Sequence, residues 1–341
     1  MASPALINAD LTELYRSTAF ENDPAPVTEF ETVAEFGLLR LRHYAPLVEA
    51  SGGLPVLLVY SLFKRPFILD LDEERSIVRC FLQRGLKVYL VDWRAPSAED
   101  SWRGLDAYVN RDLARAVDCV REREHADRVS LVGICFGGLL SLIYSALNPD
   151  AVRHLVPVAV GIERRPIVPP MVIEQTVLLH GNIPSWWIRN AVNAGVPGPR
   201  RIPQYLAAEL DEPELADARE GKLCRLCGKL EQWLNSDLPF AGQLARDIMR
   251  DVYWDGQLTD GRLHVGGKIV TLSQIRCPIL NISGARDELI PPQNTVRLVE
   301  YVGSAYARNL VFPVSHIGLI ASRAAHEQLW PRVGMWLKII E

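Results

Sequence analysis

Residues 133–138 read Gly133-Ile134-Cys135-Phe136-Gly137-Gly138 and separate two apolar runs. An apolar strand, a tight turn flanked by glycines and an apolar helix form the pattern of a nucleophile elbow. Such a turn is strained, so it favours residues that bring no Cβ into the bend. Cys135 occupies the position of the nucleophile. The alternative interpretation is a buried structural cysteine between glycine-rich turns, because free cysteine is commonly a core residue.

A cysteine nucleophile needs a base and a third group that orients the base. In α/β-hydrolase folds these groups follow in the order nucleophile, acid, histidine. Asp287 follows one apolar run that predicts a late strand, and His316 follows the next. Order and placement therefore predict a catalytic triad of Cys135, Asp287 and His316. Glu288 is the rival acid, and a solvated loop carboxylate is the plain alternative for either residue.

Attack by the Cys135 thiolate on a carbonyl carbon creates an oxyanion that needs hydrogen-bond donors. The backbone N–H groups of Phe136, at the start of the elbow helix, and of Leu62, after the first long apolar strand, are the expected donors. His316 would take the thiol proton or hold a thiolate–imidazolium pair. A sulfur nucleophile favours acyl exchange between thioesters, because the attacking and leaving groups are chemically alike.

Apolar runs alternate with helical patterns along most of the chain. The predicted strands are 29–36, 38–44, 55–60, 87–91, 128–132, 154–160, 278–283 and 309–312, of which the first two form a hairpin turning at Gly37. The predicted helices are 11–18, 73–83, 105–123 and 324–339. Strands alternating with helices predict an α/β protein with a doubly wound, mostly parallel sheet.

Between residues 163 and 255 the composition becomes irregular and rich in Pro, Arg and Trp, with short helical patterns at 222–234 and 240–253. We interpret this region as a cap inserted into the sheet domain. The predicted organisation is an N-terminal segment 1–27, an α/β-hydrolase core formed by 28–162 and 256–341, and a cap subdomain 163–255.

Composition limits the class of protein. The 341 residues are 48% hydrophobic and 23% charged, which is ordinary for a globular chain, and the net charge of −4 provides no general attraction for nucleic acid. Residues 1–10 lack a signal-peptide pattern, and no apolar run approaches the roughly 20 residues of a transmembrane helix. We expect a cytoplasmic protein with reduced cysteines. The pair Cys224 and Cys227 has no partner ligands that would complete a zinc site, so we expect no metal.

The chain resembles polyhydroxyalkanoate synthases of the α/β-hydrolase superfamily, especially the catalytic subunit of the class III type. The resemblance extends from about residue 55 to residue 337. It rests on several separated segments: residues 58–71, 88–93, 133–138, 144–150, 181–184, Asp287 with Pro291-Pro292, His316-Ile317-Gly318, Trp330-Pro331 and Trp336-Leu337.

The resemblance implies polymerisation of (R)-3-hydroxyacyl-CoA, with 3-hydroxybutyryl-CoA as the expected substrate, into a polyester through a covalent thioester. Cys135 would carry the acyl chain, His316 would activate the thiol, and Asp287 would help to activate the incoming 3-hydroxyl. A cap that opens, a homodimer, a second non-catalytic subunit and the surface of polymer granules are further implications. Coenzyme A enters as a substrate thioester, and no resident cofactor is implied. Candidate ligands of its phosphates are Arg164, Arg165, Arg200 and Arg201.

Two other functions remain open from the sequence. A cysteine hydrolase, either a polyester depolymerase or an acyl thioesterase, would use the same scaffold and differ only in the acyl acceptor. A non-catalytic protein that binds granules or a partner would keep the fold without using the thiol. The complete Cys–His–Asp set favours an enzyme over the second of these.

Overall fold

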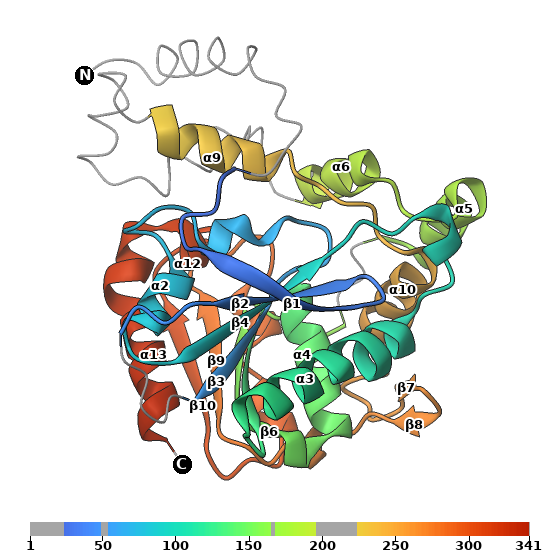
Figure 1. Ribbon diagram of the computed structural model, residues 1–341. Helices are drawn as coiled ribbons and strands as arrows, with labels where there is room; N and C mark the ends of the chain where they lie inside the picture. Colours follow the sequence, from blue (N-terminus) through green and yellow to red (C-terminus); the bar gives the residue numbers. More distant parts are fainter. Residues whose placement is uncertain (1–23, 49–53, 165–167, 196–223, 341) are drawn as a thin grey trace.

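The computed structural model describes residues 24–48, 54–164, 168–195 and 224–340, and its centre is a sheet covered by helices (Figure 1). In this part of the chain eight strands form that sheet, in the order β1-β2-β4-β3-β5-β6-β9-β10. The β1–β2 and β2–β4 pairs are antiparallel and the other pairs are parallel. The strands are β1 Phe30–Phe36, β2 Leu39–Tyr44, β3 Pro55–Val59, β4 Lys87–Trp93, β5 Val129–Ile134, β6 Val152–Val158, β9 Ile279–Gly284 and β10 Ala307–Phe312. This arrangement confirms the predicted α/β-hydrolase fold.

Helices cover both faces of the sheet. One face packs against the π-helical turn η3 (Ala107–Leu113), α3 (Ala114–Glu124) and α4 (Phe136–Leu147), and the other against α2 (Ile77–Leu82), α12 (Gly318–Ala321), η8 (Ala325–Leu329) and α13 (Trp330–Ile339). Strand β3 shows why both faces are covered. Leu57 and Val59 point into the first layer, whereas Val56 and Leu58 point into the second. Successive side chains of a strand face opposite ways, so a fully apolar strand needs two cores.

The end of β4 differs from the predicted strand 87–91, because the strand continues to Trp93. The sequence places an aspartate, Asp92, at the expected strand end, yet Asp92 is fully buried. Its Oδ2 accepts a hydrogen bond from Arg42 Nη2 at 2.6 Å and forms an ion pair of 2.7 Å with Arg40 Nη2, both on the neighbouring strand β2. Two guanidinium groups thus balance the buried carboxylate, and the strand continues through a residue that is typical of turns.

Five helical segments of the predicted cap region lie within the described residues, and Figure 1 shows α5, α6 and α9 above the sheet and α10 to its right. They are α5 (Pro170–His180), α6 (Ser185–Gly195), α9 (Cys224–Leu234), α10 (Gly242–Arg246) and the π-helical η5 (Asp247–Trp254). The last three agree with the predicted helical patterns. Helices α5 and α6 were not predicted from the sequence; α5 begins at Pro170 and α6 begins directly after Pro184. Proline is favoured at the first helical position, because its missing N–H is not needed there.

Asn182 fastens the cap to the core. Its Nδ2 donates to the carbonyl oxygen of Ser97 in the core at 2.7 Å, and its Oδ1 accepts from the N–H of Gly242 in the cap at 3.2 Å. Ile183 and Phe240 exchange backbone hydrogen bonds of 2.8 and 2.9 Å next to this point. The segment between α5 and α6 is therefore held both by the loop at Ser97 and by the residues around Gly242, which are far from it in sequence.

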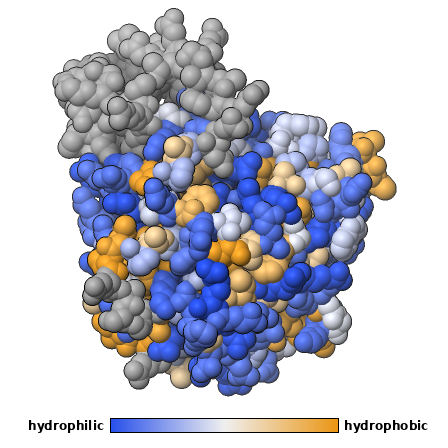
Figure 2. Space-filling model, in the orientation of Figure 1, coloured by the Kyte–Doolittle hydropathy of each residue, from blue (hydrophilic) through white to orange (hydrophobic). Residues whose placement is uncertain are grey.

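Helix α5 presents apolar side chains to the surface. Met171, Leu178 and Leu179 are all largely exposed, and Figure 2 shows apolar surface at the upper right edge, where Figure 1 places α5. None of the helices in the described ranges combines the length and apolar character needed to cross a bilayer. The predicted helix 11–18 lies outside the described residues, and the division into core and cap stays a prediction.

Candidate active site

Cys135 lies at the junction of β5 and α4 in a strained backbone conformation. Its φ is 54° and its ψ is −124°. Positive φ is uncommon for a residue with a side chain and costs on the order of 1–3 kcal/mol. The Cys135 N–H donates to the carbonyl oxygen of Val158 in the adjacent strand at 2.9 Å, and the Cys135 carbonyl accepts from the N–H of Gly138 at 3.0 Å. The surrounding backbone thus holds the bend that the sequence predicts at this position.

Gly137, the second residue of α4, has to be a glycine because the backbone at the end of β3 comes very close to it. A Cβ at Gly137 would collide with the carbonyl oxygens of Val59 and Tyr60, which end β3 and begin the following loop. A Cβ at Gly133 would lie 2.5 Å from the Gly138 Cα. The elbow is therefore packed directly against the loop after β3, as the glycine pattern indicates.

His316 and Asp287 form a buried hydrogen-bonded pair. His316 Nδ1 lies 2.7 Å from Asp287 Oδ2, and Asp287 Oδ1 accepts from the Ile290 N–H at 2.7 Å. An ionised carboxylate only accepts, so Nδ1 carries the proton and Nε2 faces away from Asp287. His316 also hydrogen-bonds to the Cys135 side chain. The three residues predicted from sequence thus lie together in the order sulfur, imidazole, carboxylate.

The pKa of His316 is raised well above its usual value. Burial alone would lower it, but the negative charge of Asp287, the hydrogen bond to that carboxylate and the hydrogen bond to Cys135 together outweigh burial. The raised pKa favours the protonated form of the imidazole once it has received a proton. The arrangement is therefore suited to a thiolate–imidazolium pair, in which the sulfur is ready to attack.

A cavity of about 130 Å³ opens onto Cys135 and His316. Most of its wall is apolar, and the apolar part includes Phe63, Ile134, Trp233, Leu234, Ile317 and Ile320. Both the core and the cap contribute, since Trp233 and Leu234 end helix α9. Glu288 also lines the cavity, whereas Asp287 is the carboxylate that binds His316. The site therefore has room for an acyl group beside the sulfur.

Three charged side chains join the cap to the core in the wall of this cavity. Lys64 Nζ lies 2.7 Å from Asp237 Oδ1, and Arg189 Nε lies 2.8 Å from Asp237 Oδ2. Lys64 also donates to the carbonyl oxygen of Leu234 at 2.5 Å. Burial lowers the pKa of Lys64, and the Asp237 carboxylate opposes that effect. This cluster could not be predicted from the sequence, because its members lie in three segments that no local pattern links.

The side chain of Phe136 packs in an aromatic group next to the nucleophile. Its ring centroid lies 5.4 Å from that of Phe63, 5.8 Å from that of Phe240 and 6.3 Å from that of Tyr253. Phe63 follows β3, and the other two belong to the cap region. The residue after the nucleophile thus fixes the elbow helix against the cap, while its backbone N–H stays at the helix start, where no intrahelical acceptor exists.

The two predicted oxyanion donors lie on neighbouring segments. Phe136 is the first residue of α4, and Leu62 is in the turn after β3, close to the Tyr60 carbonyl that contacts the elbow. Their roles as donors stay predictions. Arg164 forms an ion pair of 2.7 Å with Asp260 and is not part of the cavity wall among the described residues. Arg165, Arg200 and Arg201 lie outside the described residues.

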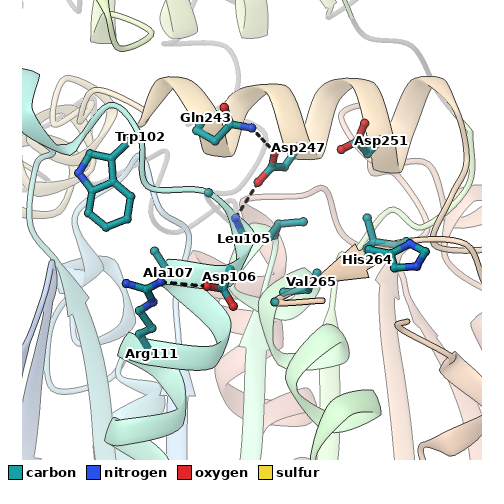
Figure 3. A pocket seen from close by; sticks show the side chains of 13 residues that line it. Trp102, Leu105, Asp106, Ala107, Arg111, Gln243, Asp247, Asp251, His264 and Val265 are labelled. Carbon is teal, nitrogen blue, oxygen red and sulfur yellow. Dashed lines mark hydrogen bonds and ion pairs between the residues drawn. The ribbon is translucent and has the colours of Figure 1, made fainter. Parts of the chain in front are cut away.

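A second cavity of about 290 Å³ lies elsewhere and contains none of the three triad residues. Figure 3 shows it between η3, the α10–η5 helix and the β7–β8 hairpin (His264–Val265 and Lys268–Ile269). Its aspartates have structural partners. Asp247 accepts from the Leu105 N–H at 2.8 Å and from Gln243 at 2.7 Å, and Asp106 pairs with Arg111 at 3.3 Å. The contact of Asp247 with Leu105 connects η5 to the residues just before η3.

Known proteins resemble this chain in sequence and in fold. An α/β hydrolase fold family profile matches residues 55–321. The chain is 33% identical over 322 residues to the poly(3-hydroxyalkanoate) polymerase subunit PhaC of Haloferax mediterranei, covering 91% of this chain but 63% of that protein. It is 33% identical to the subunit of the same name from Allochromatium vinosum, in a match that covers 83% of this chain and 80% of that protein. It is 31% identical to the Synechocystis subunit, in a match that covers 91% of this chain and 84% of that protein.

Solved structures share the architecture at low sequence identity. The monoacylglycerol lipase of Paleococcus ferrophilus has a TM-score of 0.54 and 15% identity, covering 84% of this chain and 95% of that one. An esterase of Thermogutta terrifontis has a TM-score of 0.53 and 17% identity, and the match covers 92% of this chain and 98% of that one. The chain belongs to the α/β-hydrolase fold family and, within it, to the family of the poly(3-hydroxyalkanoate) polymerase subunits PhaC.

Proposed function

We propose that this protein is the catalytic subunit of a polyhydroxyalkanoate synthase, an acyltransferase that joins (R)-3-hydroxyacyl units, and 3-hydroxybutyryl units in particular, from coenzyme A thioesters. The observation that carries the proposal is the connected set of Cys135, His316 and Asp287 at an apolar cavity. Membership of the PhaC family supports a polymerase over a hydrolase. The thioester is a substrate, and the proposal includes no resident cofactor.

Acylation of the enzyme begins at Cys135. The thiol proton passes to His316 Nε2, and the thiolate attacks the carbonyl carbon of the acyl-CoA. Backbone N–H groups of Phe136 and Leu62 stabilise the oxyanion, and each such donor is typically worth about 3 kcal/mol of barrier lowering. Collapse of the intermediate breaks the bond to the coenzyme A sulfur, which leaves with the proton from His316. Free coenzyme A and an acyl thioester on Cys135 result.

Chain growth uses a hydroxyl group as the acceptor. The 3-hydroxyl of a second acyl unit attacks the Cys135 thioester and gives its proton to His316, which Asp287 holds in the required tautomer. An ester bond forms, and the thiolate of Cys135 is released to accept its proton from the imidazolium. Cytoplasmic location, attachment to polymer granules, a homodimer and a second, non-catalytic subunit belong to the same proposal.

Incubation with 3-hydroxybutyryl-CoA tests this function. We expect free coenzyme A thiol and insoluble polyester from the wild-type chain, supplied with a class III partner subunit where needed, and neither product from Cys135→Ala. Release of soluble 3-hydroxybutyrate without polymer would identify a hydrolase instead. An intact thioester after incubation, with Cys135 unlabelled by iodoacetamide, would support a non-catalytic protein and end the proposal.

A further inference from the structure

Ser61 lies in the loop after β3, and the start of this loop packs against the elbow that carries Cys135. It follows β3 by two residues and immediately precedes Leu62. The cavity that opens onto Cys135 and His316 includes Ser61 in its wall. The residue is only 4% exposed, so its hydroxyl is removed from bulk water. A polar side chain is thus buried in the wall of the cavity that Cys135 also lines.

The Ser61 hydroxyl has no hydrogen-bond partner among the residues that the structure describes. Buried hydroxyl groups in folded proteins are normally hydrogen-bonded, because leaving one unpaired is unfavourable. The charged side chains of the same wall already have partners: Asp237 binds Lys64 and Arg189. The hydroxyl of Ser61 is therefore available to a molecule that enters the cavity.

The polar atoms of the substrate narrow the choice of partner for Ser61. Under the proposed function, the thioester carbonyl oxygen is served by backbone donors at Phe136 and Leu62. The 3-hydroxyl is the other polar group of the acyl unit, two carbons away, and it enters a mostly apolar cavity. A serine hydroxyl both donates and accepts, so it matches a substrate hydroxyl in either orientation.

We propose that Ser61 Oγ hydrogen-bonds to the 3-hydroxyl of the acyl group that is being loaded onto Cys135. This inference rests on the proposed function and adds a residue that determines specificity. A site that pairs with a substrate hydroxyl discriminates against an analogue without it, because the site's own polar group then stays buried and unpaired. Ser61 therefore selects 3-hydroxyacyl thioesters over plain acyl thioesters.

Single-turnover release of coenzyme A from (R)-3-hydroxybutyryl-CoA and from butyryl-CoA tests this role. We expect Ser61→Ala to lower kcat/KM for the hydroxylated substrate by about tenfold or more, the factor that corresponds to about 1.4 kcal/mol. The same variant should act on butyryl-CoA within about twofold of wild type, since that substrate makes no bond to Ser61. The ratio of the two rates is the readout, because a general defect in folding lowers both.

Ser61→Thr serves as the matched variant, since it keeps the hydroxyl and adds one methyl group. It should retain more of the preference for the hydroxylated substrate than Ser61→Ala. Equal losses with both substrates, or no loss with either, would overturn the role of Ser61. Failure of the wild-type protein to release coenzyme A from either thioester would instead overturn the proposed function, so the two failures are distinguishable.

Discussion

Lys64, in the loop after β3, and Asp237, in the cap, form an ion pair of 2.7 Å in the wall of the catalytic cavity. The two residues are 173 positions apart, and Asp237 is buried on the cap side. Arg189 of α6 shares the same carboxylate. A single aspartate thus connects the core loop, α6 and the end of α9, so it holds the predicted cap region against the core.

Asp237→Asn should therefore destabilise the protein and loosen the cap. Loss of the carboxylate leaves Lys64 buried without its counter-charge, and we expect a decrease of about 2 kcal/mol or more in the free energy of unfolding. Urea denaturation measures the loss, and faster alkylation of Cys135 reports the looser cap. Glu74→Gln, which removes an exposed pair with Arg323 at 3.6 Å, is the control and should change stability by less than about 1 kcal/mol. A variant Asp237→Asn as stable as wild type would contradict this role.

Asp287→Asn should change the pH at which Cys135 reacts. Asparagine keeps the shape of the side chain but loses the charge that raises the pKa of His316, so that pKa falls. Less imidazolium is then present near the sulfur at neutral pH. We expect alkylation of Cys135 by iodoacetamide near pH 7 to fall at least about tenfold. The neighbouring variant Glu288→Gln should keep the wild-type profile, and coinciding profiles for the two variants would refute the assignment of Asp287.

The same pair predicts the sign of a stability change. The pKa of His316 is raised in the fold above its unfolded value of about 6.5. The stabilising contribution is therefore fully present below about pH 6.5 and is lost as the pH rises through the raised pKa. The difference in unfolding free energy between wild type and Asp287→Asn should shrink in that direction. Denaturation at a series of pH values measures it, and a difference that grows toward alkaline pH would be inconsistent with the raised pKa.

His326 predicts sensitivity to acid. Burial lowers its pKa to about 4, and its Nε2 donates to the carbonyl oxygen of Ile320 at 2.6 Å. The unfolded chain binds a proton that the fold excludes, so this contribution is present above about pH 6.5 and is lost as the pH falls toward 4. At about 1.36 kcal/mol per pKa unit, the loss amounts to roughly 3 kcal/mol. His326→Gln should flatten the decline in unfolding free energy, whereas His264→Gln, at the surface, should follow wild type. If the unfolding free energy declined equally steeply with falling pH in all three proteins, His326 would not be the cause of the acid sensitivity.

Gly137→Ala should disrupt the elbow. The added Cβ meets the backbone oxygens of Val59 and Tyr60, which cannot move aside as a flexible side chain does. We expect a loss of about 2–3 kcal/mol in unfolding free energy and a marked loss of coenzyme A release. Gly228→Ala in α9 is the matched control, because a Cβ there has open space, and it should stabilise the helix by up to about 1 kcal/mol. Similar behaviour of the two variants would show that the close packing of Gly137 is unimportant.

The sequence predicts those parts of the molecule that depend on local pattern. The apolar runs identify every strand of the large sheet within a few residues. The chain order points to His316 and to the acidic pair Asp287 and Glu288, and the contact with His316 separates these two. The backbone at Cys135 follows from its glycine neighbours. Each of these signals is short in sequence, or depends on an order along the chain that this fold fixes.

The features that the sequence did not predict depend on contacts between distant segments. Asp92 suggests the end of a strand until Arg40 and Arg42 are known to lie beside it. Pro170 suggests a break, although it begins α5, because proline signals both ends and beginnings of helices. The Lys64–Asp237 pair requires the position of the cap, which no local pattern contains.

The bend at Cys135 is built entirely from main-chain atoms and from the glycines around it. Its N–H and carbonyl groups are held by the backbone of Val158 and Gly138, and the glycines let the chain pass close to β3. The shape of the turn and the choice of its reactive atom are therefore independent at this position. The same frame would carry an oxygen nucleophile without rebuilding, so the presence of sulfur reflects the reaction that the protein performs and not the way the protein folds.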